Sequence, residues 1–284
     1  NDTATTEIYT SRLSSAASDV YKRQAPDRPQ QEVAMHSFLS DGIEIAYIDE
    51  GEGEPIVLVH GFASNVVFNW IDPGWVSHLT RAGYRVVALD NRGHGQSQKL
   101  HDTADYSGPI MAGDVHRLMD HLSIERADVM GYSMGARISA FLGLRAPERV
   151  RSLVFGGLGG NMVRPMAGTG PIAHALEAPS IDDVTNPTAR TFRAFAEQTG
   201  SDLKALAACI RSSRDPITPE DVARLACPVL VAVGSKDVIA GPAPDLARLI
   251  PGGEALVLED RDHMKAVGDR RFKEGVVEFL ARRP

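Results

Sequence analysis

Residues 127–146 read ADVMGYSMGARISAFLGLRA, and this stretch decides the fold. The apolar run ADVMG predicts a buried strand, and ARISAFLGLRA predicts a helix that starts almost at once. Ser133 lies between the two, with Gly131 and Gly135 two positions away on either side. Such a G-x-S-x-G turn has to reverse sharply, often with a positive φ at the serine, and the small residues let strand and helix approach closely. The stretch therefore predicts a strand–turn–helix unit that exposes the Ser133 hydroxyl at the carboxyl edge of a sheet.

Short apolar runs of the same kind recur along the chain and predict further strands buried on both faces. These runs are residues 56–59, 85–90, 151–156, 228–234 and 255–258. Helix-length segments lie between most of them, at 75–82, 107–122, 134–146, 242–250 and 271–281. A hairpin over residues 38–48, turning at Asp41-Gly42, precedes the series. This alternation predicts an α/β fold with a doubly wound, mostly parallel sheet.

About 70 residues separate the predicted strands at 151–156 and 228–234. Their glycine-rich start and the helical stretch 188–213 predict a cap inserted at 158–226. The remaining segments, 36–157 and 227–284, then form one core domain.

The first 24 residues, NDTATTEIYTSRLSSAASDVYKRQ, show no apolar periodicity and no apolar core of a signal peptide. Back-translated, NDTATTEIYT and SSAASDVYKRQ resemble the two ends of a transposase-type sequencing-library adapter, in one frame and in order. We therefore expect residues 1–24 to be a disordered, adapter-derived artefact, a disordered natural tail being the alternative. Residues 25–35 would be a short leader, with Met35 as a candidate start. No signal peptide is visible, which favours a cytoplasmic location, unless the natural N-terminus is truncated here.

Charge and cysteine content restrict the partners. The chain carries 30 Lys and Arg against 37 Asp and Glu, a formal net charge of −7. Nucleic acids and anionic membranes require a cationic surface, so neither is an expected partner. No apolar run of about 18 residues is present that could span a membrane.

Cys209 and Cys227 are 18 positions apart and form no CxxC pair. We expect two reduced, buried thiols, one disulfide being the alternative. The oligomeric state cannot be read from the sequence.

A serine hydroxyl becomes a nucleophile only when a base takes its proton and a third group holds that base. His263 follows the last predicted strand, so it should project from the same sheet edge as Ser133. Asp237 follows the strand that ends at Gly234 and is the expected orienting acid. Asp262 is its rival, but a residue adjacent to His263 reaches the Nδ1 atom of that imidazole with difficulty. The chain order serine, aspartate, histidine is the one expected for a triad in such a sheet.

Val59-His60-Gly61-Phe62-Ala63 directly follows the predicted strand at 56–59. Acyl transfer needs two preorganised N–H donors where the oxyanion forms. The segment predicts that the N–H of Phe62 supplies one of them, and the N–H of Met134, the residue after the nucleophile, the other. His94 is expected as a loop residue near the mouth of the site, and Asp90 as a residue that holds its own loop.

Five segments, PIVLVHGF, DNRGHGQS, GYSMGA, GSKD and RDHM, occur in this order, and with them residues 36–283 resemble the α/β-hydrolase superfamily. The resemblance implies a Ser133–His263–Asp237 triad, an oxyanion hole from Phe62 and Met134, and a cap over the site. Haloalkane dehalogenases and epoxide hydrolases carry an aspartate in place of this serine. The HGGPG motif of proline iminopeptidases and the HGxGPG motif of C–C bond hydrolases are absent. A generic esterase or lactonase group remains.

The sequence thus predicts a serine hydrolase that cleaves small to medium carboxylic esters through an acyl-enzyme, without metal or cofactor. A lactonase and a serine perhydrolase are alternatives on the same fold, and a non-catalytic binding protein is the alternative of another class. Trp70, Leu158 and Met162 are candidates for substrate binding. For each of them, packing of the cap onto the core is an equal alternative.

Overall fold

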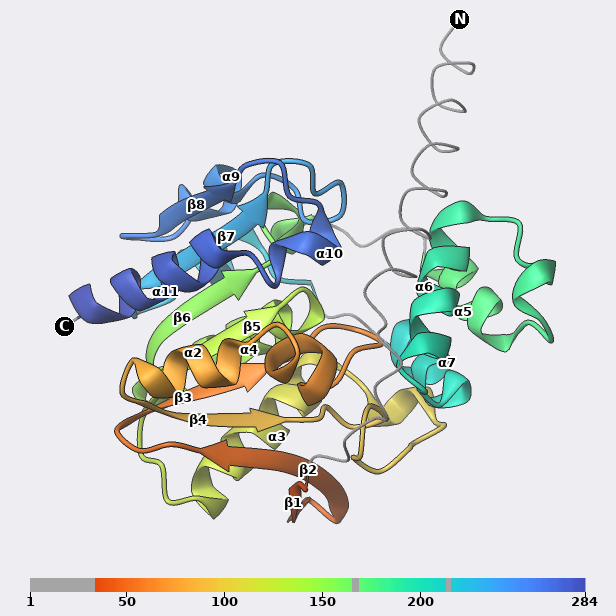
Figure 1. Ribbon diagram of the computed structural model, residues 1–284, viewed down its shortest axis with the longest axis horizontal. Helices are drawn as coiled ribbons and strands as arrows, with labels where there is room; N and C mark the ends of the chain where they lie inside the picture. Colours follow the sequence, from red (N-terminus) through yellow and green to blue (C-terminus); the bar gives the residue numbers. More distant parts are fainter. Residues whose placement is uncertain (1–33, 165–168, 213–215, 284) are drawn as a thin grey trace, which may run out of the picture.

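The computed structural model describes residues 34–164, 169–212 and 216–283 (Figure 1). The expected adapter-derived segment 1–24 and nearly all of the leader 25–35 lie outside these residues, as do parts of the expected cap. One eight-stranded sheet organises the chain, with the strand order β1-β2-β4-β3-β5-β6-β7-β8.

The strands are β1 (His36–Ser40), β2 (Ile43–Glu50), β3 (Glu54–Val59), β4 (Tyr84–Leu89), β5 (Ala127–Tyr132), β6 (Val150–Gly156), β7 (Val229–Gly234) and β8 (Glu254–Leu258). The α-helices of the described residues are α2 (Trp75–Arg81), α3 (Gly108–His121), α4 (Met134–Arg145), α5 (Gly170–Glu177), α6 (Pro187–Gln198), α7 (Leu203–Arg211), α8 (Pro219–Val222), α9 (Ala243–Ala247), α10 (His263–Ala266) and α11 (Arg270–Arg282).

The strand pairing confirms the predicted fold class. β1 and β2 form the predicted antiparallel hairpin, in which Asp41 (φ 52°) and Gly42 (φ 80°) make the two-residue turn. Positive φ at both turn positions matches the twist of the flanking strands. β2 then pairs antiparallel with β4, and all pairings among the strands β3 to β8 are parallel.

Both faces of the parallel strands are buried, which explains why their sequences read as continuous apolar runs. In β3, Val57 and Val59 pack into one core cluster with residues of α3 and α4. Their neighbours Ile56 and Leu58 pack on the opposite face, with residues of α2 and α11. The sheet is therefore doubly wound, and its carboxyl edge is left to the loops that follow the strands.

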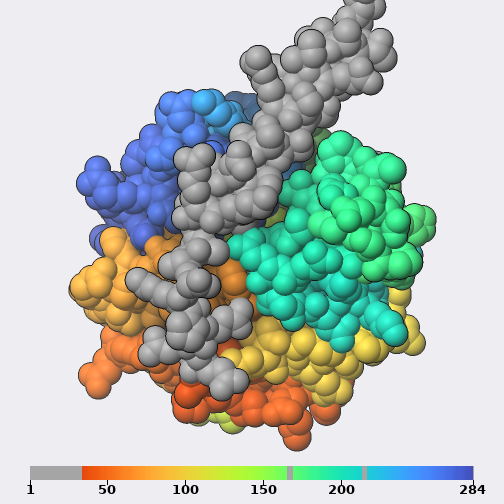
Figure 2. All heavy atoms as spheres, turned by 45° about the vertical axis from the view of Figure 1, so that its right-hand side comes forward, coloured from red at the N-terminus to blue at the C-terminus, as the bar shows by residue number. Residues whose placement is uncertain are grey.

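The region between β6 and β7 places three helices, α5, α6 and α7, beside the carboxyl edge of the sheet (Figure 1). We call these three helices the helical insertion. In the space-filling view they form a green and teal group that abuts the yellow segment around residues 95–120 (Figure 2). They lie within the stretch 158–226 that was expected to form a cap.

The helices differ from prediction in several places. The predicted helix 188–213 is two helices, α6 and α7, because Gly200 has a positive φ of 63° and Asp202 caps a new helix through the N–H of Ala205. Helix α9 is shorter than the predicted 242–250. A π-helical turn over Val67–Ile71 and the helix α5 were not predicted. None of the described helices is long and apolar enough to cross a membrane.

Candidate active site

The turn between β5 and α4 has the strained geometry that its sequence predicts. Ser133 adopts φ 54° and ψ −112°, a conformation that costs a non-glycine residue on the order of 1–3 kcal/mol. A Cβ atom at Gly135 would lie 1.9 Å from the carbonyl oxygen of Val59, and one at Gly131 would lie 2.1 Å from the carbonyl oxygen of Gly135. Only glycine fits at these two positions, so the strand, the helix and the neighbouring loop pack closely together around the serine.

Two hydrogen bonds join Ser133, His263 and Asp237. The Nε2 atom of His263 lies 3.2 Å from Ser133 Oγ, and its Nδ1 atom lies 2.7 Å from Asp237 Oδ2. The carboxylate of Asp237 has no exposed surface, and the imidazole is 12% exposed. Since a carboxylate only accepts, the proton on this neutral imidazole belongs on Nδ1. Its Nε2 lone pair then faces the serine hydroxyl, the arrangement a general base requires.

Neighbouring groups hold the aspartate and the histidine in place. The second oxygen of Asp237, Oδ1, accepts the N–H groups of Ile239 (2.9 Å) and Ala240 (3.0 Å). The Tyr132 hydroxyl donates to the carbonyl oxygen of His263. Asp262 instead caps α10, since its Oδ1 accepts the N–H groups of Met264 (3.1 Å) and Lys265 (2.9 Å). The structure thus brings Asp237, and not Asp262, to the imidazole.

The loop after β3, which carries Phe62, lies against the elbow. A Cβ atom at Gly61 would lie 3.4 Å from the Cβ atom of Ser133, so the two backbones are in close contact. None of the turn, loop and cap hydrogen bonds among the described residues uses the N–H of Phe62 or of Met134. These two N–H groups were expected to stabilise an oxyanion, which requires that neither is already paired within the protein.

Three side chains from other segments hold this loop. Asn69, on the π-helical turn, accepts the N–H of Gly61 at 3.2 Å. Asp90 accepts the N–H of Val66 at 2.7 Å, and its other oxygen accepts the N–H of Gln96 at 2.7 Å. It thus holds two loops, where one was expected.

The third side chain is Thr199, at the end of α6. Its hydroxyl lies 3.0 Å from the carbonyl oxygen of Ala63, a residue whose φ is 58°. Ala63 directly follows the expected oxyanion donor Phe62. The helical insertion is therefore hydrogen-bonded to the loop that carries this donor.

Two buried histidines, His60 and His94, lie behind the loop with ring centroids 5.3 Å apart. Nε2 of His60 accepts the N–H of Asn91 at 2.9 Å, and Nδ1 faces the carbonyl oxygen of Gly61 at 2.8 Å. That pairing requires a neutral ring with its proton on Nδ1. Burial lowers the pKa of His60 to about 4, and burial together with the neighbouring His60 lowers the pKa of His94 to about 3. His94 was expected at the mouth of the site, but it has no exposed surface.

Comparison with known proteins agrees with this fold. Residues 54–170 match the family model described as alpha/beta hydrolase fold. BpoC of Mycobacterium tuberculosis, named for a proposed non-heme bromoperoxidase activity, is 30% identical over 248 residues, which cover 78% of this chain and 91% of BpoC. The chain belongs to the alpha/beta hydrolase family.

Other similarities of this alpha/beta hydrolase are partial in length or confined to the fold. The non-heme chloroperoxidase CPO-A1 of Kitasatospora aureofaciens is 34% identical over 118 residues, 40% of each chain. The chain spans about two fifths of the length of this and similar curated relatives, 35–43% in four of them. The enol-lactonase of Burkholderia xenovorans LB400 has a similar fold, with a TM-score of 0.69 at 24% identity over 87% of this chain and 100% of that one.

The three substrate-binding candidates of this hydrolase lie in packed surroundings. Trp70 has no exposed surface and meets Trp75 edge-on at 6.2 Å, in the core cluster of α2 and α11. Met162 is equally buried, and Leu158 is partly buried against the other core cluster. This placement favours the packing alternative for Trp70 in particular. Cys209 and Cys227 are both buried and not joined by a disulfide, as expected.

Sequence reasoning missed Asn69, Asn91 and Thr199, three residues whose side chains hydrogen-bond to the backbone of the loop after β3, at Gly61, His60 and Ala63 respectively. Asn91 follows a predicted strand at the sheet edge, which was a usable signal. Thr199 ends a helix of the insertion, 136 positions from its partner Ala63, and no local pattern marks it. Within the described residues, no group of three or more His, Cys, Asp or Glu is arranged to hold a metal ion.

Proposed function

We propose that the protein hydrolyses carboxylic esters of small to medium size through an acyl-enzyme on Ser133. The observation that carries the proposal is the continuous hydrogen-bonded line from the Ser133 hydroxyl through His263 to the buried carboxylate of Asp237. A core histidine that merely packs would not connect a strained, half-buried serine to a fully buried acid.

In the first half of the reaction, Ser133 Oγ bonds to the ester carbonyl carbon while its proton moves to His263 Nε2. The negative oxygen that results is stabilised by the N–H groups of Phe62 and Met134, and removal of one such donor costs roughly 10²–10³ in rate. The carbon–alkoxide bond then breaks, and His263 returns the proton to the departing alcohol. Asp237 keeps the imidazole in the correct tautomer and stabilises its cationic form.

In the second half, His263 takes a proton from a water molecule, whose oxygen bonds to the acyl carbon. Collapse of this second intermediate releases the carboxylic acid, and the proton on His263 returns to Ser133. The base must be neutral in both halves, so kcat/KM should rise with pH and then level off.

Covalent labelling tests the proposal directly. A fluorophosphonate should modify Ser133, identified by peptide mapping, and the label should block hydrolysis of p-nitrophenyl acetate. Ser133→Ala should abolish both, whereas Ser235→Ala, an exposed serine close to the acid, should change neither. Modification at another residue with Ser133 untouched would refute the triad.

A serine perhydrolase is the second candidate, because relatives such as BpoC and CPO-A1 bear haloperoxidase names. Here hydrogen peroxide replaces water in the second half, and the acyl group leaves as a peracid. Peracid formation from an ester in the presence of peroxide, lost in Ser133→Ala, is the measurement that detects it.

A further inference from the structure

The triad determines where each part of a bound ester lies. The alkoxide oxygen has to lie near His263 Nε2, which protonates it, and the carbonyl oxygen near the N–H groups of Phe62 and Met134. The acyl chain takes the direction that remains, away from His263 and toward the side chains of Phe62 and Met134. The two halves of the ester therefore meet different surfaces.

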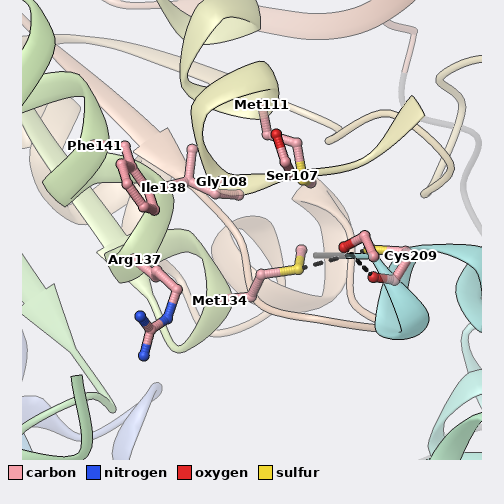
Figure 3. A pocket seen from close by; sticks show the side chains of 9 residues that line it. Ser107, Gly108, Met111, Met134, Arg137, Ile138, Phe141 and Cys209 are labelled. Atoms are coloured by element: carbon pink, nitrogen blue, oxygen red, sulfur yellow. Dashed lines mark hydrogen bonds between the residues drawn. The ribbon is translucent and has the colours of Figure 1, made fainter. Parts of the chain in front are cut away.

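The acyl side is closed by the helical insertion. The side chains of Phe62 and Met134 are each only 9% exposed and belong to the core cluster that includes residues of α7. Met134 Sδ lies 4.0 Å from Sγ of Cys209 on α7, and the ring of Phe62 lies 6.0 Å from that of Phe192 on α6. Figure 3 shows the sulfur atoms of Met134 and Cys209 facing each other across the gap between α4 and α7.

Behind this contact lies a cavity of about 20 Å³, room for roughly one water molecule. Besides Met134, its lining includes Ser107, Met111, Arg137, Phe141, Cys209 and Ser212. The guanidinium of Arg137 points away from Cys209 (Figure 3) and donates to the carbonyl oxygen of Met162 at 2.9 Å. An acyl chain of more than two or three carbons would have to displace packed side chains here.

The alcohol side is open and apolar. Val238 (84% exposed) and Ile239 (40%) directly follow Asp237, and Met264 (37%) directly follows His263. Large apolar side chains this exposed number six in the described residues, and these three flank the acid and the base. The N–H of Ile239 donates to Asp237, so the loop that presents Val238 is anchored to the triad itself. Apolar side chains that are exposed next to the acid and the base in sequence offer contact area to an apolar group bound beside the triad.

We propose that the substrates are esters of a short acyl group, acetyl or propionyl, with an apolar alcohol that lies on Val238, Ile239 and Met264. This inference rests on the proposed ester hydrolysis and names its substrate class. The acyl length is limited by the Met134–Cys209 contact, and the alcohol is selected by the exposed apolar rim.

Two ester series separate the two surfaces. The p-nitrophenyl esters from acetate to octanoate vary the acyl chain and keep the leaving group constant. From acetate to octanoate, kcat/KM should fall by about 100-fold or more, because a closed apolar pocket discriminates roughly 10–200-fold per misfitting methylene. Ethyl, butyl and hexyl acetate vary the alcohol at nearly constant leaving-group basicity. Here kcat/KM should rise by about tenfold, as methylenes become partly buried on the apolar rim.

Matched variants assign each preference to its residues. Cys209→Ala should raise the butyrate-to-acetate ratio of kcat/KM about fivefold, whereas Cys227→Ala, the same change at the other buried thiol, should leave it unchanged. Val238→Ser should lower the hexyl-to-ethyl acetate ratio about threefold; Val257→Ser, also an exposed valine, should not. Each ratio is measured on one sample, so partial unfolding of a variant cancels.

A wild-type acyl series that is flat or rises toward octanoate would overturn the acyl limit. An alcohol series that falls from ethyl to hexyl, or an equal response of Val238→Ser and Val257→Ser, would overturn the alcohol surface. If no ester of either series is turned over and Ser133 takes no label, the proposed function fails instead.

Discussion

Replacement of the buried acid, Asp237→Asn, tests the arrangement of the triad most sharply. Asp237 Oδ1 accepts two backbone N–H groups, which orient the side chain, so the amide of the variant should point its NH₂ at His263 Nδ1. Two donors cannot face each other, and the imidazole then favours the tautomer with its proton on Nε2. That tautomer cannot take the proton of Ser133.

The expected loss follows from the burial of the group. In a serine protease the equivalent change lowers kcat by about 10⁴. Because the Asp237 carboxylate has no exposed surface, solvent does not screen its charge from the imidazole 2.7 Å away. We therefore expect kcat for p-nitrophenyl acetate to fall by about 10²–10⁴, with KM little changed. The rate of fluorophosphonate labelling should fall in parallel.

Asp262→Asn is the matched control, an acid one residue from the same histidine. Its carboxylate is 42% exposed and caps α10, and asparagine caps a helix about as well. An exposed charge interacts weakly through solvent, so the loss should stay below about tenfold. Circular dichroism should show both variants folded. If Asp262→Asn lost most of its kcat while Asp237→Asn kept it, the acid would be wrongly assigned.

Three further predictions concern the oxyanion loop, acid stability and the N-terminus. Thr199→Val removes the hydrogen-bond partner of the Ala63 carbonyl. It should lower kcat about tenfold with KM unchanged, the order expected when one oxyanion donor is misplaced. Thr199→Ser should restore kcat, and an effect of Thr199→Val on KM alone would exclude a positioning role. Burial lowers the pKa of His60 to about 4 and the pKa of His94 to about 3, both from an ordinary value of 6.5, so their stabilising contribution is complete above pH 6.5. That contribution is lost as the pH falls from 6.5 toward 4, because only the unfolded chain takes up the protons, and it is on the order of 3 kcal/mol for each histidine. Thermal melts at pH 7, 5.5 and 4.5 should follow this fall, and a melting temperature that is flat over the window would contradict a buried, neutral pair of His60 and His94. A shortened chain that begins at Met35 should match the full chain in melting temperature and ester turnover; a loss of several degrees would mean that the segment before Met35 packs on the domain.

Much of the site could be predicted because its residues follow strands. Parallel strands end at one edge of a sheet, so a serine, an aspartate and a histidine that each follow a strand converge wherever the order of the strands brings them. The G-x-S-x-G pattern also predicts the close packing of strand and helix around the turn, since only glycine fits two positions before and two positions after Ser133. Ser133, Asp237 and His263 were therefore placed at one edge from sequence alone.

Other features depend on contacts between segments far apart in the chain, and no local pattern records them. The sequence favoured Asp237 over Asp262 as the partner of His263. The hydrogen bonds that direct the two carboxylates, one to the imidazole and one to the N-terminus of α10, are seen only in the structure. Trp70 looked equally suited to a pocket and to a core until the packing of α2 against α11 placed it beside Trp75.

The sequence by itself determined the doubly wound sheet, the elbow at Ser133 and the candidate triad, because period, turn chemistry and chain order are local properties. Only the tertiary structure decided that the helical insertion contacts the loop after β3 through Thr199 and meets Met134 through Cys209. The physical reason is that hydrogen bonds and packing between distant segments depend on where whole helices dock, and side chains on a helix face look alike in sequence whichever partner they meet.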